Sequence, residues 1–329
     1  MNVEQVLDPE LAAIVALRAA AGVPPPFSGS PDEARERMRR AVVAARERAP
    51  LPIVGAVEDA IAVDDTSGAL VRVPVRVYRP IGRPTSMPTV VFFHGGGFVL
   101  GSVELMDDIA RKLCRDMGAV VVSVDYRLAP EHPFPAAHED ALAATRWAIR
   151  CVDQLGGDAS RIAVAGESAG ANLATSTALA LRGCKPRLAG QLLVVPGVDM
   201  ARDVAAIEAR RRDFPMLSPN DLRDIVRLYM GEAVVHAADC PPSPLRAHDL
   251  RGMPPALIAV AGHDPLCEEG LTYAARLKAA GVPVEVYRFG DMFHTFFGMF
   301  EASASARRAN DMLCQAFVSW LNQHVLLTT

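Results

Sequence analysis

One serine in this chain stands in a setting that favours nucleophilic chemistry. An apolar run at residues 162–165 precedes the pentapeptide Gly-Glu-Ser-Ala-Gly at 166–170, and an alanine-rich stretch follows it. Because β-branched residues give way to helix formers there, the pentapeptide is predicted to join a buried strand to a helix. Glycines permit such a sharp turn, which exposes the serine hydroxyl at the helix N-terminus. Ser168 is therefore the candidate nucleophile.

A run of three glycines forms a second segment that could take part in catalysis. The segment His94–Gly97 directly follows the apolar run 89–93. Consecutive glycines leave backbone N–H groups bare, which suits the binding of a developing oxyanion. A phosphate-binding loop is the alternative, but the chain has no G-x-x-x-x-G-K-[ST] motif, and a G-x-G-x-x-G match from Gly95 fails at Leu100. The loop is predicted to stabilise negative charge on a reacting carbonyl oxygen.

A nucleophilic serine needs a general base, and the base needs an acid that orients it. His294 follows a predicted strand and is the candidate base. Asp264 follows the preceding predicted strand along the chain and is the preferred acid. Asp199 follows a still earlier strand and stays open as the alternative acid.

These side chains can meet only if the intervening elements form one sheet. Strands and helices alternate along the chain, which predicts a mostly parallel sheet of about eight strands with helices on both faces. The first two strands are expected to form an antiparallel hairpin. All the candidate residues follow strands, where ligands bind in such sheets. The predicted strands span residues 57–65, 70–78, 89–93, 119–124, 161–165, 188–195, 256–261 and 283–289.

Two segments stand outside this alternation and are expected to form a helical cap over the serine. The N-terminal segment 1–50 contains two helices with start signals at Asp8 and Ser30, the second of them heavily charged and predicted to present a solvated face. The insertion 197–253 contains an amphipathic helix that begins after Ser218. The remainder is then one α/β catalytic domain, formed by residues 51–196 and 254–329.

Composition narrows the range of partners. The 329 residues carry a net charge of -4, so no basic surface for nucleic acid is expected, and no apolar run has the roughly 20 residues that span a membrane. Six scattered cysteines without C-x-x-C pairs favour reduced thiols and a cytoplasmic location, and argue against a zinc site. The predicted strand 283–289 can form an exposed sheet edge, which suits pairing into a homodimer.

Together these segments resemble the hormone-sensitive-lipase-like group of α/β-hydrolase esterases, a bacterial carboxylesterase and lipase family. The resemblance extends over residues 57–325 and rests on five blocks in the family's order: His94–Gly97, Asp125–Ala136, Gly166–Gly170, Asp264–Leu266 and His294. Glu167 departs from the aspartate that is common at its position. The resemblance implies an α/β-hydrolase fold with a helical cap, no metal or cofactor, and short-chain carboxylic esters as substrates. It also implies a triad of Ser168, Asp264 and His294 with an oxyanion hole formed by the N–H groups of Gly96, Gly97 and Ala169.

We therefore expect a serine carboxylesterase that hydrolyses short- to medium-chain acyl esters through an acyl-enzyme. Phe98, Phe293 and Phe296 are candidates to line the substrate pocket, with ordinary core packing as the alternative for each. A non-catalytic small-molecule receptor on the same scaffold is the alternative from another functional class. Amides, carbamates and lactones are the alternative substrates within the hydrolases.

Overall fold

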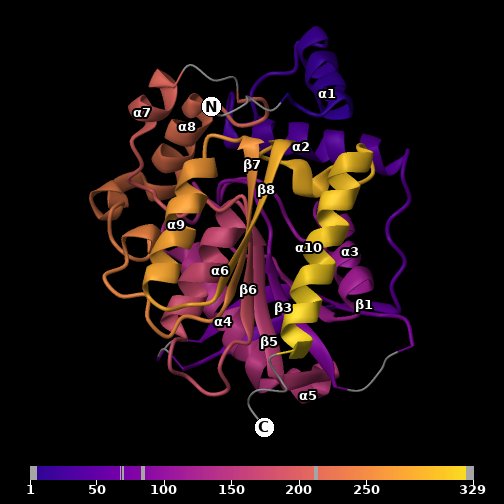
Figure 1. The fold of residues 1–329 in the computed structure, drawn as a ribbon, viewed down its shortest axis with the longest axis vertical. Coiled ribbons are helices and arrows are strands. Elements are labelled where there is room, and N and C mark those ends of the chain that lie inside the picture. Colours follow the sequence, from indigo (N-terminus) through magenta and orange to yellow (C-terminus); the bar gives the residue numbers. More distant parts are fainter. Residues whose placement is uncertain (1–5, 67, 69, 83–85, 211–213, 324–329) are drawn as a thin grey trace.

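The computed structural model describes residues 6–66, 68, 70–82, 86–210 and 214–323. Its centre is one eight-stranded sheet in the order β1-β2-β4-β3-β5-β6-β7-β8 (Figure 1). The strands are β1 (Ala56–Asp64), β2 (Val71–Arg79), β3 (Met87–Phe93), β4 (Val120–Val124), β5 (Gly157–Glu167), β6 (Gly190–Val194), β7 (Ala256–His263) and β8 (Val284–Phe293). Each overlaps a strand predicted from the sequence.

Strand direction divides the sheet into two parts. β1 pairs with β2, and β2 with β4, in antiparallel fashion, whereas every pairing from β4 through β8 is parallel. The central strands β3 and β4 are buried at every residue, because helices cover both of their faces. The predicted architecture, a mostly parallel sheet of about eight strands with helices on both faces, is confirmed, and β8 lies at the edge of the sheet as expected.

Helices cover both faces of this sheet (Figure 1). α4 (Ala136–Arg150), α6 (Ala169–Ala180) and α9 (Cys267–Ala279) share one apolar core with the sheet. α3 (Asp107–Met117) and α10 (Ala304–Gln323) bury the opposite face and contact each other.

Helix α3 is absent from the sequence prediction. Its N-cap residue Met106 makes no side-chain hydrogen bond to the first turn, but its buried residues Ile109, Leu113 and Met117 recur at helical spacing. The short helices α5 (Val152–Leu155) and α7 (Val204–Ala209) were also not predicted.

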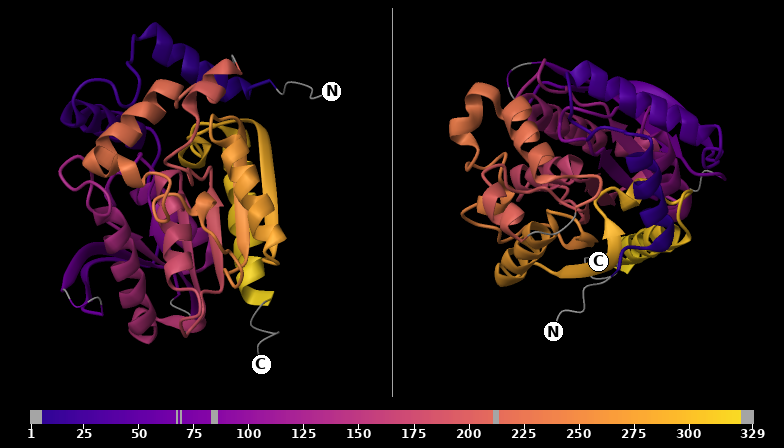
Figure 2. Two further views of the ribbon diagram at one scale, coloured as in Figure 1. Left: turned by 90° about the vertical axis from the view of Figure 1, so that its left-hand side faces the viewer. Right: turned by 90° about the horizontal axis from the view of Figure 1, so that it is seen from above.

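The remaining long helices lie at the end of the sheet where the parallel strands finish. α1 (Pro9–Ala20) begins after its N-cap Asp8, and α2 (Pro31–Arg46) begins with a capping box of Ser30 and Glu33, as predicted. α8 (Pro219–Met230) begins at its N-cap Ser218. Figures 1 and 2 show these three helices, with α7, gathered beyond the carboxyl ends of the strands.

The N-terminal segment and the insertion contact each other at this end. The backbone N–H of Phe27 donates to Asp221 Oδ1 of α8 at 3.4 Å. Among the described residues, no helix is long and apolar enough to cross a lipid bilayer.

Candidate active site

Ser168 occupies the sharp turn between β5 and α6. Its backbone has φ 56° and ψ -116°, a left-handed conformation that costs a non-glycine residue free energy. Neighbouring glycines make the turn possible. A Cβ atom on Gly166 would lie 2.2 Å from the carbonyl carbon of Gly170, and one on Gly170 would lie 2.0 Å from the carbonyl oxygen of Phe93. The turn therefore brings the serine, the start of α6 and the end of β3 together.

The structure brings Ser168, His294 and Asp264 into a continuous hydrogen-bonded row. His294 Nε2 lies 2.7 Å from Ser168 Oγ, and His294 Nδ1 lies 2.9 Å from Asp264 Oδ2. Asp264 follows β7 and its other oxygen, Oδ1, accepts the N–H of Leu266 at 2.9 Å, which fixes the carboxylate. A histidine held by a carboxylate on one nitrogen presents the other nitrogen as a proton acceptor for the hydroxyl.

The alternative acid, Asp199, has a different partner. Its two carboxylate oxygens accept from the guanidinium of Arg246 at 2.7 and 2.9 Å, and Oδ1 also accepts the N–H of Ala201. The carboxylate that contacts His294 is that of Asp264, 30 residues away in the sequence.

Burial and charge act on the imidazole of His294 in opposite directions. Burial lowers the pKa of His294, but the charge and hydrogen bond of Asp264 outweigh this effect, so the pKa lies above its ordinary value. Burial raises the pKa of the adjacent Glu167 carboxyl to about 7, an effect that the nearby His294 partly offsets. When ionised, Glu167 adds to the negative potential that favours the protonated imidazole.

The glycine loop after β3 lies beside this row and leaves backbone donors bare. Gly96 and Gly97 have φ angles of 119° and 62°, which favour glycine. Within the described part of the chain, their N–H groups donate to no protein oxygen. Ala169 is the first residue of α6, so its N–H has no partner within the helix. His94 stacks on Tyr126 with ring centroids 4.3 Å apart, which supports the base of the loop.

The three candidate pocket phenylalanines are all buried. Phe98 stacks on Tyr229, whereas Phe293 and Phe296 belong to the apolar core under α3 and α10. Their role in lining a substrate pocket stays a prediction.

Two residues next to this site were missed by the sequence analysis. Arg35 of α2 contacts the loop after the glycines, and Tyr229 of α8 packs against Phe98. No local signal identifies either one, because Arg35 is one of many charges on α2 and Tyr229 is one of several apolar residues on α8.

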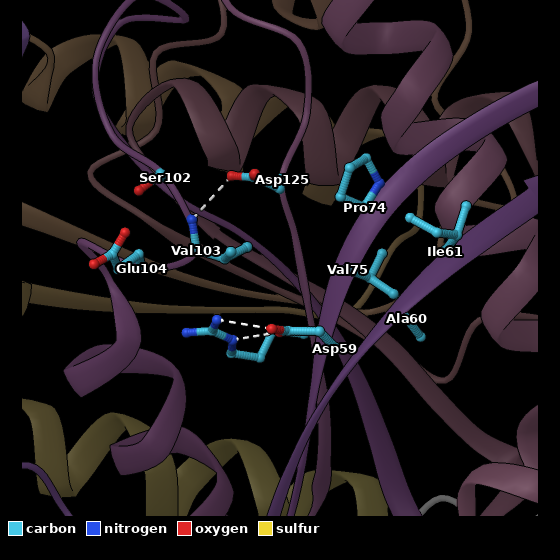
Figure 3. Close-up of a pocket in the computed structure, with 10 residues that line it drawn as sticks. Asp59, Ala60, Ile61, Pro74, Val75, Ser102, Val103, Glu104 and Asp125 are labelled. Atoms are coloured by element: carbon cyan, nitrogen blue, oxygen red, sulfur yellow. Dashed lines mark hydrogen bonds and ion pairs between the residues drawn. The ribbon is translucent and has the colours of Figure 1, made fainter.

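A separate hollow of about 430 Å³ lies between the β1–β2 hairpin and residues 102–104 (Figure 3). Three of its charged side chains have partners within the protein: Asp59, Arg76 and Asp125. Arg76 pairs with Asp59 at 2.6 Å, and Asp125 accepts the N–H of Val103 at 3.0 Å. Ser168, His294 and Asp264 do not line this hollow. The described residues also contain no group of three or more His, Cys, Asp or Glu side chains placed to hold a metal ion.

The chain is similar in sequence and fold to known esterases. Residues 90–298 match a family model described as an alpha/beta hydrolase fold. The esterase LipI of Mycobacterium tuberculosis is 42% identical over 241 residues, covering 72% of this chain and 74% of that protein. The ethyl acetate hydrolase of Pseudomonas putida is 32% identical and covers 97% and 99% of the two chains. A solved structure of a hyperthermophilic esterase from Pyrobaculum calidifontis superposes with a TM-score of 0.87 at 36% identity, covering 96% of this chain and 99% of that one.

Proposed function

The chain belongs to the α/β-hydrolase family and is a carboxylic ester hydrolase, and we propose that Ser168, His294 and Asp264 form its catalytic triad. The observation that carries this proposal is the row from Ser168 Oγ to His294 Nε2 at 2.7 Å and from His294 Nδ1 to Asp264 Oδ2 at 2.9 Å. Hydroxyl, imidazole and carboxylate in this order are the components of nucleophilic acyl transfer.

The proposed reaction proceeds in two halves through an acyl-enzyme. His294 takes the proton of Ser168 as the oxygen attacks the ester carbonyl, and Asp264 holds the imidazole in the required tautomer and stabilises its charge. The N–H groups of Gly96, Gly97 and Ala169 donate to the resulting oxyanion, and losing one such donor costs roughly 3 kcal/mol. The protonated imidazole then delivers its proton to the leaving alcohol. Water, activated by the same imidazole, releases the acid.

The cap proposed from the sequence comprises residues 1–50 and 197–253, and the remaining residues form the catalytic domain. Contacts at the oxyanion loop support this division. A Cβ atom on Gly97 would lie 2.7 Å from Phe27 Cζ and 2.7 Å from Ile225 Cγ1, so both segments pack directly on the loop. An apolar cover this close favours compact acyl groups, which leads us to propose short- to medium-chain acyl esters as substrates.

Replacing Ser168 by alanine tests the proposed chemistry. Hydrolysis of p-nitrophenyl butyrate is expected to fall by roughly 10⁴-fold or more, because the nucleophile is lost. Ser123→Ala is the matched control, since that buried hydroxyl of β4 has no hydrogen-bond partner among the described residues. Retained turnover in folded Ser168→Ala enzyme would contradict the triad. A panel of amides, carbamates and lactones separates the alternative substrate classes, and turnover of any activated ester rules out the non-catalytic receptor.

Two further proposals concern the state of the protein in the cell. Among the described residues, five cysteines form no disulfide: Cys114, Cys151, Cys184, Cys240 and Cys314. Their state supports a reducing, cytoplasmic location that cell fractionation can test. The edge position of β8 supports a homodimer formed by two copies of this strand.

A further inference from the structure

The loop that carries the oxyanion donors contains one residue in a costly backbone conformation. Gly96, Gly97, Phe98 and Gly101 all have positive φ, and Phe98, at 62°, is not a glycine. A non-glycine residue keeps such a conformation only where its surroundings hold it. Inside the loop, the N–H groups of Val99 and Leu100 donate to the carbonyl of Gly96, which closes a turn but leaves its outer side to other segments.

Arg35 of α2 holds the loop from the N-terminal segment. Its Nε donates to the carbonyl of Val99 at 2.9 Å and its Nη2 to the carbonyl of Ala129 at 2.8 Å. The same guanidinium makes a bidentate ion pair with Glu131, in which Nη1 lies 2.7 Å from Oε1 and Nη2 lies 2.7 Å from Oε2. The N–H of Ala129 also donates to the carbonyl of Phe98. Arg35 therefore links the glycine loop to the neighbouring segment 129–131.

Tyr229 of α8 holds the loop from the insertion. Its ring lies nearly parallel to that of Phe98, with centroids 3.9 Å apart and an interplanar angle of 8°. Its hydroxyl lies 2.7 Å from His138 Nδ1, and the other nitrogen of that histidine lies 3.1 Å from Asn172 Oδ1. Tyr229 is therefore fixed at both its ring and its hydroxyl.

The direction of these hydrogen bonds follows from the groups around them. Asn172 Nδ2 donates to the carbonyls of Gly197 and Pro242, so its Oδ1 is the acceptor that faces His138. Burial outweighs the bond to Asn172 and lowers the pKa of His138 to about 4, which leaves the ring neutral. His138 then donates from Nε2 and accepts the Tyr229 hydroxyl proton at Nδ1.

We propose that Arg35 and Tyr229 are positioning residues of the esterase reaction: they hold the loop Gly96–Gly101 so that the N–H groups of Gly96 and Gly97 point at the reacting carbonyl oxygen. This inference rests on the proposed triad and oxyanion hole. It assigns the two cap segments a part in stabilising the transition state, beyond covering the substrate.

The test compares matched pairs of variants. Arg35→Ala is paired with Arg39→Ala, because Arg39 lies on the same helix but makes its two-pronged ion pair with Glu36 of that helix. Tyr229→Leu is paired with Tyr273→Leu, because Tyr273 is equally buried but bonds to Thr175 in the core. We expect kcat for p-nitrophenyl acetate to fall about 10- to 100-fold in Arg35→Ala and Tyr229→Leu, with KM nearly unchanged.

A second readout separates positioning from general damage. An alkyl trifluoromethyl ketone forms a tetrahedral adduct with the serine and places an oxyanion in the hole. Its inhibition constant is expected to rise in parallel with the loss of kcat/KM in both variants, and to stay within about threefold of wild type in both controls. Tyr229→Phe retains the stacked ring and is expected to recover most of the activity.

The outcomes that overturn the inference are distinct from failure of the triad. If Arg35→Ala and Tyr229→Leu match their controls, or raise KM without lowering kcat, the inference is wrong. If inhibitor affinity is retained while kcat falls, the oxyanion hole is intact and the inference is also wrong. Retained activity in Ser168→Ala would instead overturn the proposed function, whatever these variants do.

Discussion

At the scale of single residues, the site depends on a histidine whose proton affinity is set by its neighbours. Burial alone would make His294 a weak base, and the Asp264 carboxylate at 2.9 Å more than reverses that effect. The neighbouring Glu167 contributes in the same direction as Asp264. The pKa of His294 is raised as a result, so the imidazole loses its neutral, basic form as pH falls through a value above the usual one near 6.5.

This balance predicts how the pH profile responds to one substitution. Asp264→Asn removes the charge that raises the pKa of His294, so the acidic limb of kcat/KM is expected to move to lower pH. The same change should lower kcat by roughly 10⁴-fold, because the amide favours the wrong imidazole tautomer. Rates of ester hydrolysis measured from pH 5 to pH 9 provide the check.

Asp199→Asn is the control for this prediction. Asp199 is paired with Arg246 rather than with His294, so its replacement should leave the acidic limb in place. An unmoved limb in Asp264→Asn, or a shift in Asp199→Asn of the same size, would mean that Asp264 does not control the base.

At the scale of elements, the junction of β3, β5 and α6 explains why glycine occupies the serine turn. The strands pair in parallel with Phe93 opposite Gly166, so α6 begins directly against the end of β3. A side chain at Gly170 would collide with the Phe93 carbonyl at 2.0 Å, and backbone cannot move aside as a flexible side chain can. The turn and the strand end are therefore one packed unit.

We expect Gly170→Ala to lower the free energy of unfolding by about 3 kcal/mol or more, because β3 and α6 must separate. Esterase activity should fall as well, since Ser168 and the glycine loop are carried by these two elements. Chemical denaturation with the linear extrapolation measures the loss. Gly298→Ala is the control: the added Cβ meets only Ile109 Cδ1 at an ordinary 3.5 Å, so stability should change by less than about 1 kcal/mol. Equal stability of the two variants would refute this account of the junction.

At the scale of the whole molecule, the sheet has one edge strand with half-exposed aromatic residues. Tyr287 and Phe289 of β8 stack with ring centroids 6.4 Å apart, on the strand that ends the sheet order. A strand at the edge of a sheet favours pairing with an identical strand.

The proposed homodimer therefore predicts a solution mass about twice the chain mass of 35.2 kDa in multi-angle light scattering. Tyr287→Lys places a charge on the edge in each copy, and it should shift the protein toward monomer. The triad lies within one chain, so ester hydrolysis should persist in that variant. A wild-type protein that is monomeric across the concentrations measured would contradict the proposal.

The strands, the turn at Ser168 and the glycine loop could be predicted from the sequence. Each rests on local rules: continuous apolar runs for buried strands, capping residues for α1, α2 and α8, and glycines where backbone approaches backbone. Helix α3 was not predicted, although its buried residues Ile109, Leu113 and Met117 recur at helical spacing.

The pairing of the site's side chains follows from the folded chain. Each aspartate follows a strand, so the sequence left open which one pairs with His294. The fold brings Asp264 to His294 and Asp199 to Arg246. It also turned Arg35 inward from a helix whose charges had predicted a solvated face. Contacts between residues tens to more than a hundred positions apart depend on the order of strands in the sheet and on where each loop leaves it. Local spacing does not encode that order, so the pairing of side chains emerges only when the chain is folded.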